Sequence, residues 1–293
     1  MTQAPIRALV LVFAGAIATW SAAARAEDEA APKASSGEPV AAAASAADPH
    51  DPAEEPHKTY RFIGLRFRDV VVPKFMINLF ADGGATVNVP MVGPELGIRR
   101  DHLEYDFAIE YADYSMNAFL FKGHSDGPET YEIVSSSMKL LYFTVDLLYD
   151  IPIDKSGRFS FLIGGGVGLA PVFGSLYRNQ AYPLHGNNKA SPDDVTRWGK
   201  CVAPPANGMN VGPGKPAYLA SNGKPYCDGS NDHYGGYDEP SWAGGGSKPL
   251  LFPWISLPQL SLRYKPLKEL ETRADLGFSI TGFFFGLTAA YGL

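Results

Sequence analysis

The feature of this sequence that most limits its fold is a period-two alternation between large apolar side chains and ions. In HLEYDFAIEYAD (102–113), an apolar residue at every second position alternates with Glu104, Asp106 and Glu110. Successive side chains of a β-strand point to opposite faces of its sheet. The stretch therefore predicts a strand with one apolar face and one charged face.

Seven further stretches show the same alternation. The full set of predicted strands is 60–69, 94–99, 102–113, 139–150, 159–170, 258–264, 273–280 and 283–293. One face is almost entirely aromatic and aliphatic. The other carries Arg66, Arg68, Glu95, Arg99, Glu104, Asp106, Glu110, Asp146, Asp150, Arg263, Arg273 and Asp275. We expect an all-β fold, a closed antiparallel transmembrane β-barrel of eight strands. A ten-stranded barrel is the alternative if 74–80 and 86–90 add a strand pair instead of extending the first hairpin.

The charged face is better explained as the lumen of a barrel than as the solvent face of a soluble sandwich. A solvent face gives no role to the glycines that share it, namely Gly164, Gly166, Gly168, Gly277 and Gly286. In a small barrel the lumen is filled by side chains, and glycines leave room for long arginines there. Buried ions of opposite sign can then pair and hydrogen-bond.

The connections differ in length on the two sides of the sheet. They are short at 100–102, 151–157 and 265–270, and long at 70–92, 116–134 and 174–253, with a tight exception at 281–282. This asymmetry is typical of outer-membrane barrels. Aromatic residues are expected at both membrane interfaces. The inner set is Tyr60, Tyr149, Phe159, Tyr264 and Tyr291, and the outer set is Tyr111, Tyr114, Phe173, Trp254 and Phe283.

The first 26 residues are typical of a secretory signal peptide. Arg7 precedes the apolar stretch ALVLVFAGAIA, and Ala24-Arg25-Ala26 matches a small-x-small cleavage pattern. Residues 27–58 are rich in Ala, Pro and Glu and poor in large apolar groups, which predicts a disordered linker. We expect this linker in the periplasm and the barrel, from residue 59 to 293, in the bacterial outer membrane.

The last strand, SITGFFFGLTAAYGL, places Phe285, Leu287, Ala289, Tyr291 and Leu293 on one face. In this it resembles bacterial outer-membrane β-barrel proteins of the small eight-stranded type. The resemblance implies that these alternate apolar residues are the recognition signal for barrel assembly, although Leu293 stands where Phe is commonest. The stretches VVVPKFMINLFADGG and NDHYGGYDEPSWAGGGSKPLLFPW also resemble an uncharacterised delta-proteobacterial (myxobacterial) barrel family. That resemblance covers 60–293 and implies location and fold, without an activity for any residue.

The longest connection, 174–253, contains the chain's two cysteines, Cys201 and Cys227. An exported chain reaches an oxidising compartment, so we expect a disulfide rather than two free thiols. The stretch CDGSNDHYGGYDE also gathers oxygen ligands of the kind that calcium prefers, although the spacing is not that of an EF-hand. These are Asp228, Asn231, Asp232, Asp238 and Glu239. A solvated acidic loop is the preferred interpretation, and no cofactor is expected.

The formal net charge of −6 gives no basic footprint for nucleic acid. We therefore expect a structural or surface-interaction role without catalysis. The expected partners are outer-membrane lipid, the barrel assembly machinery and an extracellular partner of the loop 174–253. A narrow pore or transporter of small solutes is the first alternative. A barrel enzyme acting on lipid or peptide is the second, with His124 and Asp126, or His233 and Asp232 or Ser230, as candidate pairs.

Overall fold

The computed structural model describes residues 52–79, 81–184, 191–201, 219–229 and 233–293. All of them belong to one compact unit, 47–293. The expected signal peptide and the linker up to residue 51 lie outside the described residues.

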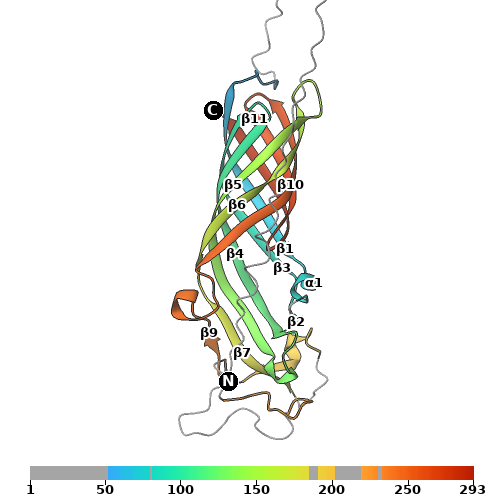
Figure 1. Ribbon diagram of the computed structural model, residues 1–293, viewed down its shortest axis with the longest axis vertical. Coiled ribbons are helices and arrows are strands. Elements are labelled where there is room, and N and C mark those ends of the chain that lie inside the picture. The colour runs from blue at the N-terminus through green and yellow to red at the C-terminus, as the bar shows by residue number, and fades with distance from the viewer. Residues whose placement is uncertain (1–51, 80, 185–190, 202–218, 230–232) are drawn as a thin grey trace, which may run out of the picture. The chain divides into compact units, whose positions relative to one another are not determined.

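Eight of the described strands form a closed antiparallel barrel (Figure 1). They are β1 (Thr59–Val72), β3 (Val87–Arg100), β4 (Leu103–Gly123), β5 (Glu132–Pro152), β6 (Phe159–Phe173), β10 (Leu251–Leu267), β11 (Leu270–Ser279) and β12 (Gly282–Gly292). Each strand pairs with the next in this series, and β12 closes the barrel on β1, with Leu65 opposite Ala289. The expected fold class and the expected eight strands are confirmed.

The ten-stranded alternative is wrong. Residues 86–90 mostly belong to β3, which pairs with β1 up to Val72 opposite Val87. Residues Lys74–Ile77 form the short helix α1 instead of a strand. Pro73 stands between β1 and α1, and a proline cannot donate to a strand ladder, so pairing stops there.

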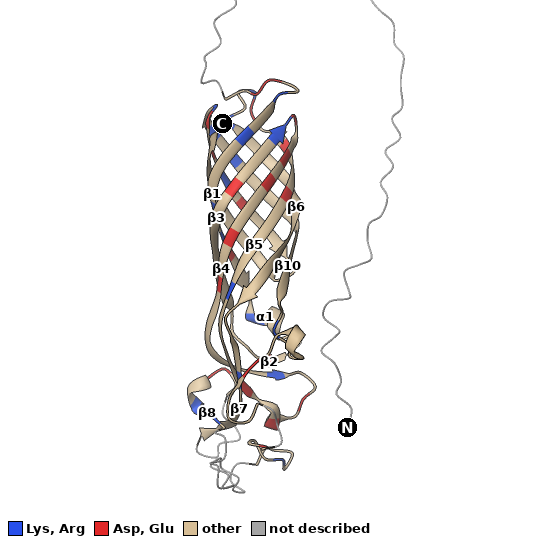
Figure 2. Ribbon diagram, turned by 90° about the vertical axis from the view of Figure 1, so that its left-hand side faces the viewer, with Lys and Arg blue, Asp and Glu red and all other residues tan. Residues whose placement is uncertain are grey.

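The two faces of the barrel strands are sorted as the alternation predicts. Leu65, Leu147 and Leu287 on the outer face are 59%, 48% and 62% exposed, while Arg66, Asp106 and Asp146 on the inner face are fully buried. Charged residues recur along the barrel strands in Figure 2. Every strand contributes large exposed apolar groups, for example Leu65, Leu96, Phe107, Leu147, Val167, Leu262, Leu276 and Phe285. A closed sheet with an apolar belt around it is the form in which strands cross a bilayer.

Among the described residues, no helix has the length and apolar character needed to span a membrane.

β4 and β5 continue beyond the belt, because each has 21 residues and a tilted strand needs only about 10 to cross a bilayer. At their far ends, β2 (Ala81–Gly83) pairs with β4, and β7 (Leu176–Pro183) pairs with β5. Two short strands, β8 (Trp198–Lys200) and β9 (Tyr237–Asp238), pair in turn with β7. We call this extension the platform: residues 113–138, the described part of 174–250, and β2 (Figure 1). The expected loops 116–134 and 174–253 are therefore partly paired strands.

The opposite end of the barrel, the turn end, has only short connections at 101–102, 153–158 and 268–269. Three residues of the expected aromatic girdles face inward instead: Tyr60, Tyr114 and Trp254. Trp254 is fully buried. A register shift between Ser256 and Gln259 exchanges the two faces of β10. Strict alternation counted back from the inward Arg263 therefore predicts that Trp254 faces outward, whereas it faces inward.

Candidate functional site

The centre of the lumen is an ion cluster around Arg66. Its guanidinium pairs with Glu95, lies 2.9 Å from Asp146 Oδ2 and 3.7 Å from Asp106 Oδ2. Glu110 is more distant, with 3.8 Å from Arg66 Nη1 to Glu110 Oε2. All these groups are fully or almost fully buried. Their mutual pairing offsets the cost of removing several charges from water.

Arg273 extends the cluster toward the turn end. Its nitrogens lie 2.6 Å from Asp106, 2.9 Å from Asp275 and 3.0 Å from both Glu95 and Glu104. Arg263 pairs with Glu104 and with Asp150 and donates to Ser160 Oγ at 3.2 Å. All twelve charged residues predicted for the lumen lie on the inner face of the barrel and are buried.

The row of glycines in β6 makes room for this cluster. A Cβ placed on Gly166 would lie 2.0 Å from Asp146 Oδ1. Gly166 sits opposite both Asp146 of β5 and Ser256 of β10. The missing side chain therefore allows Asp146 to lean across β6 toward the arginines.

An apolar layer closes the lumen on the platform side. It consists of Val70, Val89, Met91, Ala112, Leu140, Tyr142, Ala170, Trp254 and Phe284, all buried. Arg68 joins this layer to the ion cluster: it donates to Asp146 Oδ2 at 2.8 Å and lies 5.3 Å from the Trp254 ring and 4.8 Å from the Phe284 ring. Cations at these distances are attracted by aromatic faces.

Residues 52–58 cover the turn end of the lumen. Glu54 pairs with the buried Lys265 and lies 3.4 Å from Arg99 Nε. The backbone N–H of His57 donates to Asp101 Oδ1 at 2.7 Å. The part of the predicted disordered linker that is described thus makes ordered contacts with three barrel strands or turns.

Sequence reasoning missed four groups of the lumen: Glu54, Lys265 and Glu271 at the turn end, and Gln259 beside the central cluster. Arg99 donates to Glu271 at 2.6 Å, and Gln259 Nε2 lies 3.3 Å from Asp146 Oδ2. Lys265 and Glu271 continue the alternation of Arg263 and Arg273. They were missed because the predicted strands ended at 264 and began at 273, whereas β10 and β11 reach 267 and 270.

The residues of the expected assembly signal face outward on β12 and, for Leu293, directly after it. Phe285, Leu287, Tyr291 and Leu293 are strongly exposed, and Ala289 is exposed on the same face. Their role in assembly stays a prediction.

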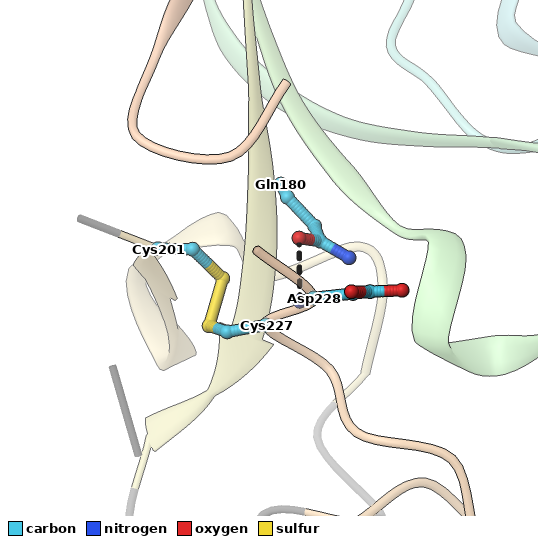
Figure 3. Close-up of a disulfide and its surroundings, with 4 residues drawn as sticks. All are labelled: Gln180, Cys201, Cys227 and Asp228. Atoms are coloured by element: carbon cyan, nitrogen blue, oxygen red, sulfur yellow. Dashed lines mark hydrogen bonds between the residues drawn. A yellow bond between two sulfur atoms is a disulfide. The ribbon is translucent and has the colours of Figure 1, made fainter. Parts of the chain in front are cut away.

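In the platform, Cys201 and Cys227 form a disulfide (Figure 3). Both ends of the bridge are tied to Gln180 of β7, which accepts from the Cys201 N–H through its backbone carbonyl at 2.8 Å and from the Asp228 N–H through Oε1 at 3.0 Å. The bridge borders a small buried cluster of Leu120, Ile133, Ala181, Trp198, Ala220 and Tyr226. The platform therefore has a core of its own.

A second tie links the segment around β9 to β5 and β7 through partly buried charged groups. His233 Nδ1 lies 2.5 Å from Glu132 Oε1, and Arg178 Nε donates to Glu132 Oε2 at 2.7 Å. Glu239 accepts from the backbone and hydroxyl of Ser247 at 2.6 and 2.7 Å. Burial acts to raise the pKa of Glu239, but these hydrogen bonds and the charges of Arg178 and His233 hold it below its usual value.

The candidate catalytic pairs do not form as expected. His124 Nδ1 lies 2.9 Å from Asp82 Oδ1. The hydrogen bond from Lys122, at 2.5 Å, lowers the pKa of Asp82 against a smaller opposing effect of burial. His233 contacts Glu132, and its predicted partners Asp232 and Ser230 lie outside the described residues.

The acidic stretch 228–239 is not gathered around a common point where it is described. Asp238 accepts from Ser175 Oγ at 2.9 Å, and Glu239 belongs to the ion cluster of β9. Asn231 and Asp232 lie outside the described residues. Within the described part of the chain, no group of three His, Cys, Asp or Glu residues is placed to hold a metal ion.

The platform also has a cavity of about 430 Å³ between β5, β7, β8 and β9. It is lined by Ile133, Ser135, Tyr177, Asn179, Lys200 and Asp238, among others. Aromatic, charged and amide groups converge there, which is typical of sites for polar ligands.

The apolar belt, the ion-filled lumen and the platform define a membrane-spanning β-barrel with an ordered extension at one end. No family model matches the sequence, and no curated protein matches it. Membership of the delta-proteobacterial family stays a prediction.

The solved structures that resemble the chain include two surface proteins. Neisserial surface protein A (NspA) has 10% identity and a TM-score of 0.32, with 79% of this chain and 94% of that one covered. Ail, the attachment invasion locus protein of Yersinia pestis, crystallised with the heparin analogue sucrose octasulfate, has 8% identity and a TM-score of 0.28. The alignment with Ail covers 80% of this chain and 94% of that one. At these TM-scores neither likeness bears on what this chain binds or does.

Proposed function

We propose that this protein is a bacterial outer-membrane barrel with a closed lumen, and that it acts by binding a partner through its platform. One contrast carries the proposal. The lumen is filled by paired ions and closed by an apolar layer, whereas the platform has its own core, disulfide and cavity. The part of the molecule that is built to meet other molecules thus lies beyond the membrane.

In this proposal the platform faces the cell exterior and the turn end faces the periplasm. Short periplasmic turns and larger external connections are the usual arrangement. The segment 52–58 contacts the turn end, which would leave the chain before it in the periplasm. An outward platform also places the disulfide where oxidised cysteines persist.

A closed lumen is the reason to prefer binding over transport. Arg66 and Arg273 hold six carboxylates between them. To open a path, several of these pairs would have to separate, and breaking one buried pair costs about 3–5 kcal/mol. The layer around Trp254 and Phe284 would also have to move.

The purified protein in a planar bilayer tests closure. We expect no discrete conductance steps in molar KCl over a wide range of applied voltage. Reproducible steps that disappear on heat denaturation would support the pore alternative instead.

Attachment of cells or extracted surface material to the protein in nanodiscs tests the platform's role. We expect attachment to the full chain, and none when residues 176–250 are replaced by a short Gly-Ser linker. The shift in gel mobility on boiling, which folded barrels show, controls for an intact barrel. Equal attachment to both proteins would contradict the proposal.

We also propose that the outward row of β12 binds the barrel assembly machinery. Tyr291→Ser should lower the amount of folded protein in the outer membrane. Leu262→Ser changes an outward apolar residue of similar exposure on β10 and should have a smaller effect. An equal loss in both variants would show that lipid contact alone, without a recognition signal, accounts for the defect.

A further inference from the structure

The cavity of the platform lies on one face of the sheet formed by β5, β7, β8 and β9. Tyr177 is opposite both Ser135 and Asp238, Asn179 is opposite Ile133, and Lys200 is opposite Ala181. Directly opposite residues of an antiparallel pair share a face. These side chains therefore line one wall of the cavity, although they come from four strands.

Asn179 is the feature that singles out this cavity. The residue is only 8% exposed, yet its Oδ1 accepts no hydrogen bond. Its Nδ2 stands beside Gly236, where a Cβ would lie only 3.1 Å away. Leaving a buried acceptor unpaired costs about 1–3 kcal/mol. Oδ1 is not exposed to solvent, so the amide would have to turn toward the cavity for a ligand hydroxyl to donate to it and remove this cost.

The groups around Asn179 are also largely uncommitted. Tyr177 is 46% exposed, and Lys200 is exposed without an ion pair or hydrogen bond among the described residues. Asp238 accepts from Ser175 Oγ through one oxygen, Oδ2. This wall of the cavity thus combines an aromatic ring with one amide acceptor, one carboxylate and one ammonium donor.

We propose that this cavity binds a sugar residue of a surface glycan. Pyranose rings present a face of C–H groups, which packs on an aromatic ring such as Tyr177, and hydroxyls at their edge. These hydroxyls would donate to Asn179 Oδ1 and Asp238 and accept from Lys200. The volume of about 430 Å³ is within the range of small-molecule sites. The inference deepens the proposed function, on which it rests, by naming the class of partner.

The position of the cavity suits a ligand outside the membrane. On β5 the apolar belt ends near Leu141, and Ser135 lies farther along the strand. At about 3.3 Å per residue and a tilt of about 40°, this separation is about 15 Å along the barrel axis. A sugar of another molecule can therefore reach the cavity without entering the lipid.

A glycan microarray probed with the labelled protein in nanodiscs tests the inference. We expect a restricted set of glycans to be bound, and Tyr177→Ala to weaken their binding about tenfold through loss of the stacking surface. Tyr177→Phe keeps the ring and should retain most of the binding. Trp242→Ala removes another exposed aromatic ring of the platform and should change nothing.

Asn179→Leu tests glycan binding with a variant that is expected to keep its stability. Because it removes an unpaired buried acceptor, it should leave the thermal midpoint of the platform unchanged or higher. Glycan binding should nevertheless fall about three- to tenfold, the effect of one lost neutral hydrogen bond.

Two results would overturn the inference: no glycan bound by the wild-type protein, or binding that neither Tyr177→Ala nor Asn179→Leu weakens. If attachment of cells still requires residues 176–250 in either case, the proposed function stands and only the sugar site fails. If the wild-type protein attaches to nothing, the proposed function fails as well.

Discussion

At the scale of single residues, Arg66 is one of two arginines that each pair with four carboxylates of the lumen. It is fully buried and lies among Glu95, Asp106, Glu110 and Asp146. Arg66→Leu should lower the free energy of unfolding in detergent by about 3–5 kcal/mol, because it leaves buried carboxylates without their cation. The measurement is the midpoint of denaturant unfolding followed by tryptophan fluorescence.

Arg61 provides the matched control, because it lies on the same strand with an exposed side chain. Arg61→Leu should shift the midpoint little. An equal shift in both variants would contradict the inward placement of Arg66.

Glu54 offers a test of the contact between the linker and the lumen. Lys265 is 1% exposed, and Glu54 is its ion-pair partner among the described residues. Glu54→Gln should destabilise the barrel by about 2 kcal/mol, the order of a hydrogen bond to a charged group. Glu55→Gln breaks an exposed pair with Lys58 and should cost less than 1 kcal/mol, about the value of a surface salt bridge. Equal midpoints for the two variants would show that residues 52–58 do not hold the turn end.

The disulfide between Cys201 and Cys227 spans 26 positions of the chain. Closing a loop of this length removes about 3–4 kcal/mol of unfolded-state freedom in the chain-entropy account. The intact protein should therefore have a mass two hydrogens below that of the dithiol form. Cys201→Ser with Cys227→Ser should make the platform, but not the barrel, sensitive to protease. Free-thiol labelling of the unreduced protein would refute the bridge.

At the scale of elements, the stability of the platform should depend on pH through Glu239, which ties β9 to Ser247. The folded state lowers the pKa of this carboxylate. Its contribution is therefore complete above the usual glutamate value of about 4.5 and is lost as the pH falls through the lowered value. Trp242, whose indole donates to Ser247 O at 3.1 Å, should report the change by fluorescence at roughly pH 5 to 3.

Glu239→Gln should remove most of this titration, since the amide keeps the shape of the side chain and carries no charge. Identical fluorescence titrations of the wild-type protein and the variant would contradict the role of Glu239.

The strands of the barrel could be predicted from the sequence because each has one lipid face and one charged face. On β4 this contrast extends from Leu103 to Tyr111. From Asp113 onward, burial no longer alternates strictly between the two faces of the strand. The platform strands were therefore read as loops. Trp254 was misplaced for a different reason: the register shift in β10 changes its face without any mark in the alternation.

The two candidate sites, the lumen ions and the cavity, also differ in whether the sequence predicts them. The twelve predicted lumen ions follow from parity along each strand, so they could be named before the structure. The cavity could not, because Ser135, Tyr177, Lys200 and Asp238 come from four strands whose pairing is set by long connections. Only the cysteines pointed to an ordered structure in that part of the chain.

At the scale of the whole molecule, the protein separates two tasks along one axis. Ion pairs and the apolar layer close the barrel, and the lipid-facing belt holds it in the membrane. The platform has a core and cavity that share no residue with the closing layer. Changes to the platform should therefore leave the barrel folded, which is why the variants of Tyr177 and Asn179 can be compared in an intact protein.

The most direct test of this account is labelling of the wild-type protein from the lipid phase. A diazirine-bearing lipid is reconstituted with the protein, activated by light, and the labelled residues are located by mass spectrometry. We expect label on Leu65, Tyr105, Leu147 and Phe285, which are exposed on the belt, and none on Arg66, Glu104 or Asp106. Label on the charged set in preference to the apolar set would contradict the barrel as described.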